Sequence, residues 1–278
     1  MTLQLAERPL TAFLDGEDSP DIVNPIHSTA VAAEYGYRAP LVGGVTVYGW
    51  LTPVILDLLG ERWLTEGWAD VRFRRPVFPG DALTARCERR EDGSAGIAIL
   101  NAGGAACIEG EVGLAPPPLL RDFHSPSARD AVARPATLPR LALETAPHGE
   151  DLRPMLVPFA MEDARAWATG KQRDASSRWI GEGAFVHPSW IAARMTPLLH
   201  HSFDYGPSIH TRSEVVHLAP AKAGQAFTVA GHFIRAYEER GHHVAELDGV
   251  LLGEDGRELA RLRHTTIFRI RPPKSAPA

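Results

Sequence analysis

The sequence predicts an α+β protein in which one unit, a helix followed by several antiparallel strands, occurs twice. The run at residues 44–59 is apolar on nearly all sides, as expected of a helix enclosed by other structure. Segments that alternate polar and apolar residues follow this run and are separated by turn residues, which is typical of half-buried strands. The same order of features recurs after residue 154.

Two short matches define the repeat. Residues 51–55 (LTPVI) match residues 195–199 (MTPLL), and residues 80–84 (GDALT) match residues 224–228 (GQAFT). Both pairs are 144 positions apart (195 minus 51, and 224 minus 80). Two matches at one spacing, with no net insertion between them, indicate a duplicated structural unit.

The expected elements of each half follow in chain order. In the first half, an acidic segment leads into a polar loop at residues 24–27, and the strands after the helix are residues 70–75, 82–87, 98–101 and 105–112. In the second half, the helix is expected at residues 188–200 and the strands at residues 209–216, 226–237, 242–252 and 258–270. The predicted domains are a first half (1–115), a Pro-rich linker draped over the surface (116–153), a degenerate second half (154–271) and a disordered tail (272–278).

Composition narrows the class of protein. The 278 residues are 44% hydrophobic and carry a net charge of −5, so they can form a sizeable core and have no basic surplus for nucleic acid. Only two cysteines, Cys87 and Cys107, are present, which argues against a disulfide framework and fits a reducing cytoplasm. No apolar run is long enough to span a bilayer, and the acidic N-terminal segment does not resemble a signal peptide. We expect a soluble, cytoplasmic protein that binds neither membranes nor nucleic acid.

Two features of the first half point to a site. In the loop at residues 24–27 (NPIH), Pro25 forces Asn24 out of the helical region, so His27 is expected on a turn. Gly43 and Gly44 open the apolar helix, and because neither has a Cβ they let backbone amides approach a ligand closely. Each feature also has an ordinary structural interpretation, a hydrogen-bonded surface histidine and close packing of the helix on the sheet.

These residues resemble the MaoC-like or (R)-specific enoyl-CoA hydratase (hydratase 2) family, whose motifs run roughly Gly-Asp-x-Asn-Pro-[Ile/Leu]-His and Ala-His-Gly-Met. The matching stretches in this chain are NPIH at residues 24–27, the alanines at 30, 32 and 33, VGGV at 42–45 and VRFRRPVFPGD at 71–81. In the second half, MEDARAW at 161–167 and VHP at 186–188 stand at corresponding places. The resemblance covers most of the chain outside the linker and tail, and it implies a double hotdog fold.

The resemblance also implies roles for individual residues. His27 would be the general base, since imidazole titrates near neutrality and can accept and donate a proton. The amide of Gly44, with Gly43 before it, would donate to the oxyanion at a helix N-terminus. Asn24 would hold the loop or a substrate group, and Asp21 would orient and polarise the water or His27.

One position departs from the family pattern. The family acid stands five residues before its histidine, which is Ile22 here, and Asp21 is one residue further upstream. The loop therefore either adjusts by one residue or lacks the acid. The second half has no NPIH motif, and Pro188 removes the backbone donor expected there. We therefore expect one active site in the first half, with the second half shaping the acyl tunnel.

The predicted function is that of an acyl-thioester hydratase/dehydratase acting on enoyl and 3-hydroxyacyl esters of coenzyme A or of a carrier protein. It would need no metal and no redox cofactor, with coenzyme A present only as part of the substrate. The alternatives are an acyl-CoA thioesterase and a non-catalytic acyl-thioester-binding protein. The basic cluster at Arg72, Arg74 and Arg75 would be a solvated strand face or, alternatively, a contact for the phosphates of coenzyme A. Two fused copies imitate a homodimer and could pair again, as a homodimer of double hotdogs.

Overall fold

The computed structural model describes residues 4–19, 24–114, 116–118 and 120–272. The strands, all paired antiparallel, are β1 (Leu5–Thr11), β2 (Gly67–Phe73), β3 (Ala82–Arg89), β4 (Ala95–Asn101), β5 (Ala106–Leu114), β6 (Glu150–Asp151), β7 (Met155–Phe159), β8 (Ile209–His217), β9 (Gln225–Glu239), β10 (His242–Leu252) and β11 (Glu258–Arg269). The helices are η1 (Pro25–His27), α1 (Thr29–Glu34), α2 (Gly44–Gly49), α3 (Thr52–Leu59), α4 (Trp63–Glu66), η2 (Leu143–Thr145), α5 (Met161–Ala166), η3 (Trp167–Lys171), α6 (Pro188–Ala192) and α7 (Met195–Ser202).

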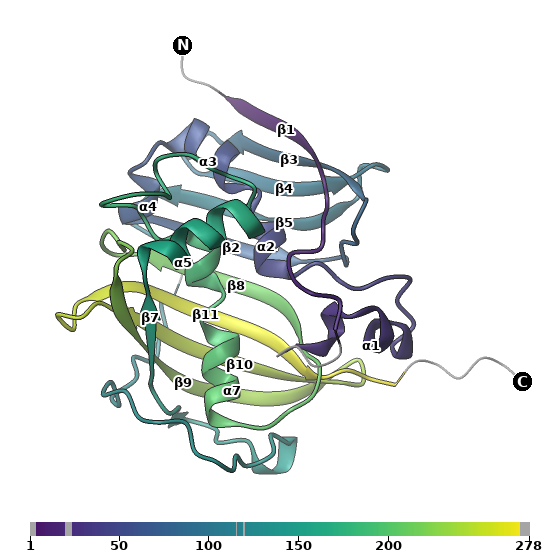
Figure 1. Ribbon diagram of the computed structural model, residues 1–278, viewed down its shortest axis with the longest axis vertical. Coiled ribbons are helices and arrows are strands. Elements are labelled where there is room, and N and C mark those ends of the chain that lie inside the picture. Colours follow the sequence, from purple (N-terminus) through teal and green to yellow (C-terminus); the bar gives the residue numbers. More distant parts are fainter. Residues whose placement is uncertain (1–3, 20–23, 115, 119, 273–278) are drawn as a thin grey trace, which may run out of the picture.

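One sheet of eleven strands runs through both halves of the molecule (Figure 1). Its order is β1-β3-β4-β5-β2-β8-β11-β10-β9-β6, and β7 also pairs with β9. The first five strands come from the first half and the others from the linker and the second half. This is the α+β double hotdog fold that the sequence predicts, with β1, β6 and β7 as additional strands that its pattern does not reveal.

The two halves meet at the pairing of β2 with β8. Asp70 lies opposite Glu214, and these two residues are 144 positions apart (214 minus 70), so the pseudo-twofold axis of the repeat passes between them. Two carboxylates facing each other would repel. Arg212 compensates by donating two hydrogen bonds to Asp70, at 2.9 and 2.8 Å, and one to Glu214 at 2.7 Å.

The central helix of each half differs from the prediction. The sequence predicts one continuous helix at residues 44–59, but α2 ends at Gly49 and α3 begins at Thr52. The second half repeats this break between α6 and α7. Pro53 and Pro197 cause it in both copies, because proline lacks an N–H and its ring clashes with the carbonyl four residues earlier.

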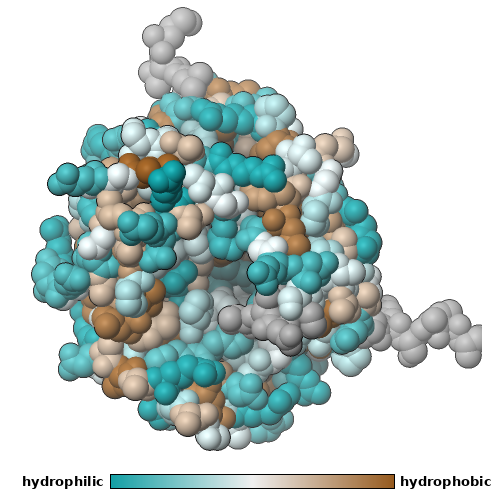
Figure 2. All heavy atoms as spheres, in the orientation of Figure 1, coloured by the Kyte–Doolittle hydropathy of each residue, from teal (hydrophilic) through white to brown (hydrophobic). Residues whose placement is uncertain are grey.

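The core lies between the sheet and these helices. Its largest fully buried side chains include Tyr48, Trp63, Trp179, Phe227 and Phe233. Cys87 and Cys107 are free and buried, and burial raises the pKa of Cys87 to about 12, so the Cys87 thiol is chemically inert. On the face shown in Figure 2, hydrophobic residues are scattered among hydrophilic ones. Among the described residues, no helix is long and apolar enough to cross a membrane.

The linker covers part of the second half. Phe123 packs against Ala230, Val250 and Leu252 of the second-half strands. Leu141 is only 5% exposed and belongs to the main core, so the linker does more than drape over the surface. The predicted disordered tail, apart from residue 272, lies outside the described residues.

Candidate active site

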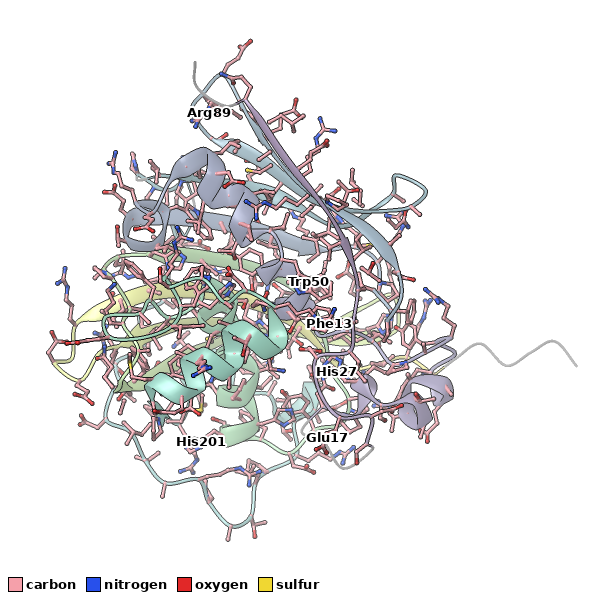
Figure 3. The ribbon with its side chains drawn as sticks, turned by 45° about the horizontal axis from the view of Figure 1, so that its top comes forward. Phe13, Glu17, His27, Trp50, Arg89 and His201 are labelled. Atoms are coloured by element: carbon pink, nitrogen blue, oxygen red, sulfur yellow. The ribbon has the colours of Figure 1, made fainter. Side chains whose placement is uncertain are left out.

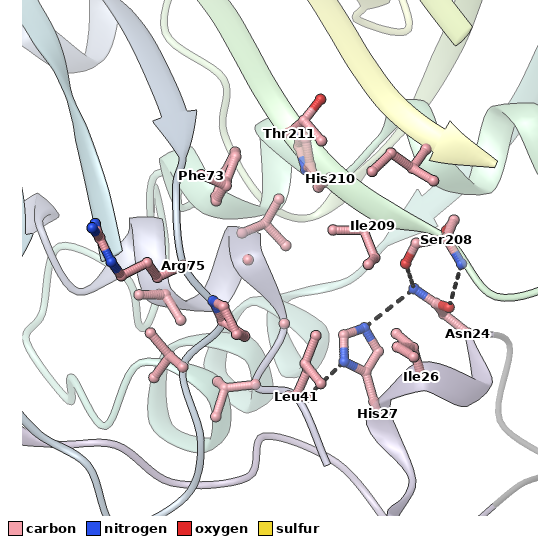
Figure 4. A pocket seen from close by; sticks show the side chains of 18 of the residues that line it. Asn24, Ile26, His27, Leu41, Phe73, Arg75, Ser208, Ile209, His210 and Thr211 are labelled. Carbon is pink, nitrogen blue, oxygen red and sulfur yellow. Dashed lines mark hydrogen bonds between the residues drawn. The ribbon is translucent and has the colours of Figure 1, made fainter. Parts of the chain in front are cut away.

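A pocket of about 670 Å³ lies between the two halves. The first half contributes the loop at residues 24–27, the segment at residues 41–47 and Phe73 of β2. The second half contributes residues 208–211 at the start of β8 (Figure 4). The structure therefore brings His27, Asn24, Gly43 and Gly44, four of the five predicted site residues, into the wall of one pocket. The fifth, Asp21, lies outside the described residues.

The turn that carries His27 is the short helix η1. Asn24 precedes it with an extended backbone (φ −122°, ψ 94°), and Pro25 occupies its first turn. Ile26 is 1% exposed and packs in a small cluster with Leu41 and Phe78, which anchors the turn to the body of the protein. His27, the next residue, is only half-buried and its ring lines the pocket.

Asn24 determines the tautomer of His27. Its Oδ1 accepts the Ser208 N–H at 3.0 Å and its Nδ2 donates to the Ser208 carbonyl at 3.0 Å, so the orientation of the amide is fixed (Figure 4). The same Nδ2 lies 3.3 Å from Nε2 of His27. Because an amide nitrogen can only donate, Nε2 carries the lone pair. The proton is then on Nδ1, which donates to the Leu41 carbonyl at 2.7 Å.

The surroundings keep His27 neutral. Burial lowers its pKa below the ordinary value, and this outweighs the Leu41 carbonyl and the Asp15 carboxylate, which both raise the pKa. Lys171 lowers the pKa further by charge repulsion. At pH 7 the ring is therefore an uncharged base with its acceptor nitrogen on the side of Asn24.

Gly43 and Gly44 form the N-terminal end of α2. Gly44 is the first residue of the helix, so its N–H has no acceptor within the helix. A Cβ on Gly44 would lie 3.0 Å from the Phe73 ring, and a Cβ on Gly43 would lie 3.3 Å from Oδ2 of Asp15. Both glycines thus allow close packing, and Gly44 also lines the pocket.

Asp15 and Lys171 also belong to this region, and the sequence does not predict them. The Asp15 carboxylate accepts from the Gly43 N–H at 3.4 Å and from the Thr46 hydroxyl. Lys171 donates to Asp15 Oδ2 at 3.2 Å and to the Asp15 carbonyl at 2.9 Å. Asp15 lies in an acidic segment that has no motif, and Lys171 is 156 positions away, so no local spacing could have connected them.

Exposed guanidinium groups stand around the same pocket. Its lining includes Arg74, Arg75, Arg240 and Arg271, all exposed. Arg74 pairs with Glu109 at 2.7 Å, and Arg75 donates to the Ala106 carbonyl at 2.6 Å. Arg72 differs, since it pairs with Asp70 at 3.3 Å on the sheet.

Other histidines do not form a metal site. His201 bonds to the Val132 carbonyl at 3.0 Å, while its neighbour His200 stacks on Tyr205 with ring centroids 3.9 Å apart. Within the described part of the chain, no three His, Cys, Asp or Glu side chains are placed to hold a metal ion together.

Comparison with known proteins establishes the fold. No protein-family model matches the sequence, and no curated protein matches it. Among solved structures, a protein described as a MaoC domain dehydratase from Chloroflexus aurantiacus is 13% identical, with a TM-score of 0.65 over 97% of this chain and 96% of that one. A conserved hypothetical protein from Mycobacterium tuberculosis, described as a double hotdog, is 15% identical, with a TM-score of 0.62 over 96% of each chain.

A third solved structure carries a different activity in its description. This oleoyl thioesterase from Lactobacillus plantarum is 12% identical, with a TM-score of 0.51 over 96% of this chain and 97% of that one. At such identities the similarities confirm the double hotdog fold and the structural resemblance to MaoC-like dehydratases. The reaction has to be argued from the pocket itself, because dehydratases and thioesterases share this fold.

Proposed function

We propose that this protein is an acyl-thioester hydratase/dehydratase, which interconverts enoyl and 3-hydroxyacyl thioesters in the pocket between its halves. The observation that carries the proposal is the presence of His27, neutral and with its acceptor Nε2 defined, in the same pocket as Gly44, whose N–H has no acceptor within its helix. The first group suits a general base, and the second suits a donor to a developing oxyanion.

The chemistry follows from these two groups. Water first replaces Asn24 Nδ2 as the hydrogen-bond donor to Nε2 of His27, and Nε2 then takes a proton from this water as the water oxygen bonds to the β-carbon of the enoyl thioester. The electrons of the C=C bond move toward the carbonyl, and the Gly44 N–H donates to the enolate oxygen. The imidazolium then returns its proton to the α-carbon, which restores the neutral base and completes the addition of water.

The remaining lining fits a substrate with an apolar chain and a charged carrier. Val45, Val47 and Ile108 line the pocket near Phe73 and provide an apolar wall. The exposed guanidiniums of Arg75, Arg240 and Arg271 at the same pocket suit phosphate groups, as coenzyme A or a phosphopantetheine arm would supply.

Thioester hydrolysis is the second candidate. The same base could direct water at the thioester carbonyl, and the same Gly44 N–H would then meet the oxyanion of the tetrahedral intermediate. A solved structure with a similar fold is described as a thioesterase, and this similarity supports hydrolysis as the alternative reaction. The two reactions differ in product, since only hydrolysis releases a free thiol.

One assay separates these reactions. The 278-residue chain is incubated with crotonyl-CoA, and loss of enoyl absorbance is followed separately from release of thiol. We expect absorbance loss without thiol release, and a rate reduction of about 10²–10⁴-fold in His27→Ala. His201→Ala, which removes a histidine bonded to Val132 outside the pocket, is the control and should keep the wild-type rate.

Three results would contradict the proposal. Thiol release without hydration would indicate a thioesterase. Tight binding of the ester with neither reaction would indicate a binding protein. A wild-type rate in a folded His27→Ala variant would remove His27 from the mechanism.

A further inference from the structure

An ion pair between the two halves adjoins the proposed site, since its carboxylate accepts from the Gly43 N–H. Asp15 belongs to the N-terminal segment of the first half, and Lys171 is the last residue of η3 in the second half. Their side chains meet at 3.2 Å, and the Asp15 side chain is only 10% exposed. Lys171 also donates to the Asp15 carbonyl at 2.9 Å, so it holds both the side chain and the backbone of Asp15.

We propose that Asp15 and Lys171 are positioning residues of the active site, which hold the segment at residues 41–44 against His27 and set the charge around its imidazole. The inference rests on the function proposed above. It gives the second half a defined task, because Lys171 supplies a charge to a site whose predicted base and oxyanion donor both belong to the first half.

The segment at residues 41–44 is held from two sides. At one end, the Leu41 carbonyl accepts the His27 Nδ1–H at 2.7 Å. At the other end, the Gly43 N–H donates to Asp15 at 3.4 Å, and the Thr46 hydroxyl one turn later donates to the same carboxylate. Gly44 follows Gly43 directly, so a shift of this segment displaces the proposed oxyanion donor relative to the base. Displacements of about 1 Å in such groups are costly to catalysis.

Lys171 is itself fixed against the first half. It ends a five-residue π-helix, a form that is rare in proteins and frequent at functional sites. Its carbonyl accepts from Trp50 Nε1 at 3.2 Å, and the Trp50 ring packs on Phe13 with centroids 5.2 Å apart. The guanidinium of Arg173 lies 3.6 Å from the centre of the Phe13 ring. Figure 3 shows Phe13 and Trp50 close together on the side of the molecule that holds His27.

The pair also acts on His27 by charge. The charged groups that influence His27 are Asp15, which raises its pKa, and Lys171, which lowers it, while the Leu41 carbonyl and the Asn24 amide are neutral neighbours. Burial would raise the pKa of Asp15, but Lys171, the Thr46 hydroxyl and His27 together bring it below the ordinary value. Asp15 is therefore ionised at neutral pH.

The test compares variants that change charge with one that does not. Asp15→Asn removes the negative charge, Lys171→Met removes the positive charge, and Thr46→Val removes only a hydroxyl bonded to Asp15. We expect Asp15→Asn and Lys171→Met to lower kcat at least tenfold with a smaller change in KM. The acidic limb of the pH profile should move to lower pH in Asp15→Asn and to higher pH in Lys171→Met, and should not move in Thr46→Val. Lys171→Arg should recover most of the rate.

A direct titration keeps this inference separate from the proposed reaction. NMR of the histidine ring carbons, with His27 assigned by comparison with His27→Gln, reports its protonation in each folded variant whether or not the protein turns over an ester. Opposite shifts in the Asp15 and Lys171 variants are the expected result. Shifts in the same direction, or none, would overturn the role of the pair, whereas absence of turnover in the wild type would count against the proposed function alone.

Discussion

The N-terminal ends of the two central helices show how the halves have diverged. In the first half, Gly43 and Gly44 add no side chains of their own to this end, which lines a pocket. In the second half, the positions 144 residues later are His187 and Pro188. His187 is 3% exposed, its Nδ1 accepts from the Ser189 N–H at 3.2 Å, and its ring packs on Trp179 at 4.6 Å. The N-terminal end of α2 therefore lines a pocket, whereas the N-terminal end of α6 is covered by the side chain of His187.

This difference shows that one unit of a duplicated pair can close its own helix end and still contribute contacts to the pocket at the other helix end. The second half places Ser208 against Asn24, which fixes the orientation of the amide next to His27. It also places Lys171 against Asp15. Its contribution to the pocket is thus a wall and a charge, whereas the proposed reacting groups are those of the first half.

Histidine content separates the halves as well, and it leads to the largest effect that we predict. Residues 1–115 contain one of the twelve histidines, His27. In the second half, His187, His217 and His264 are fully buried, and burial lowers the pKa of His187 to about 3 and that of His217 to about 4. The pKa of His264 is also well below its ordinary value.

Acid should therefore destabilise the fold through the second half. Below about pH 6.5 the unfolded chain binds protons at these histidines and the folded chain does not, so stability is complete above that pH and is lost as the pH falls toward 4. These three groups alone contribute a loss of about 4 kcal/mol per pH unit, and His200 and His210, whose pKa values burial also lowers, to about 4 and about 3, add to it. Urea unfolding followed by circular dichroism at pH 7.5, 6.5 and 5.5 measures this slope.

A variant identifies the origin of that acid sensitivity. His217→Gln removes one buried titratable ring, whose centroid lies 5.4 Å from that of the Trp63 ring, and it should reduce the slope by about 1 kcal/mol per pH unit. Stability that is unchanged between pH 7.5 and 5.5 would contradict this explanation.

The second prediction places at the start of α2 the proline that begins α6. Gly44→Pro removes the N–H at the first helical position, where proline is otherwise well accommodated. The backbone of Gly43 (φ −56°, ψ 126°) is compatible with a following proline. We expect the hydration rate to fall about 10²–10³-fold, as loss of one oxyanion donor does in other enzymes.

Gly44→Ala is the matched control for this substitution. It adds a Cβ that meets the same Phe73 ring 3.0 Å away but keeps the N–H. The alanine variant should retain much more activity than the proline variant, at a similar melting temperature. Equal losses in the two variants would mean that crowding of Phe73, and not the missing donor, accounts for the effect.

The fold was predictable from sequence because short sequence patterns and their repetition along the chain encode it. Alternating strands, turn residues and the 144-residue repeat define the double hotdog, and the resemblance rests on short motifs such as NPIH. The break in each helix was also encoded locally, by Pro53 and Pro197, but the apolar pattern at residues 44–59 outweighed those prolines in the prediction.

The candidate site was only partly predictable, since much of it depends on contacts between distant segments. The sequence singles out Asn24 and His27 by a motif and Gly43 and Gly44 by their place before the helix. It gives no indication that Asn24 bonds to Ser208, 184 positions away, or that Asp15 pairs with Lys171. Such partners depend on how the halves pack, which no spacing along the chain reveals.

The smallest predicted effect concerns the N-terminal end of α6, which His187 covers. Pro188→Gly restores a backbone N–H to the second helix, but His187 still fills the space in front of it. Added freedom in the unfolded chain should reduce stability by about 0.4–1 kcal/mol. The variant is best assayed together with His27→Ala, because any activity from a second site would then stand out. We expect no recovery of hydration, and a rate above that of His27→Ala alone would show that Pro188, rather than the buried His187, prevents a reaction at the second helix.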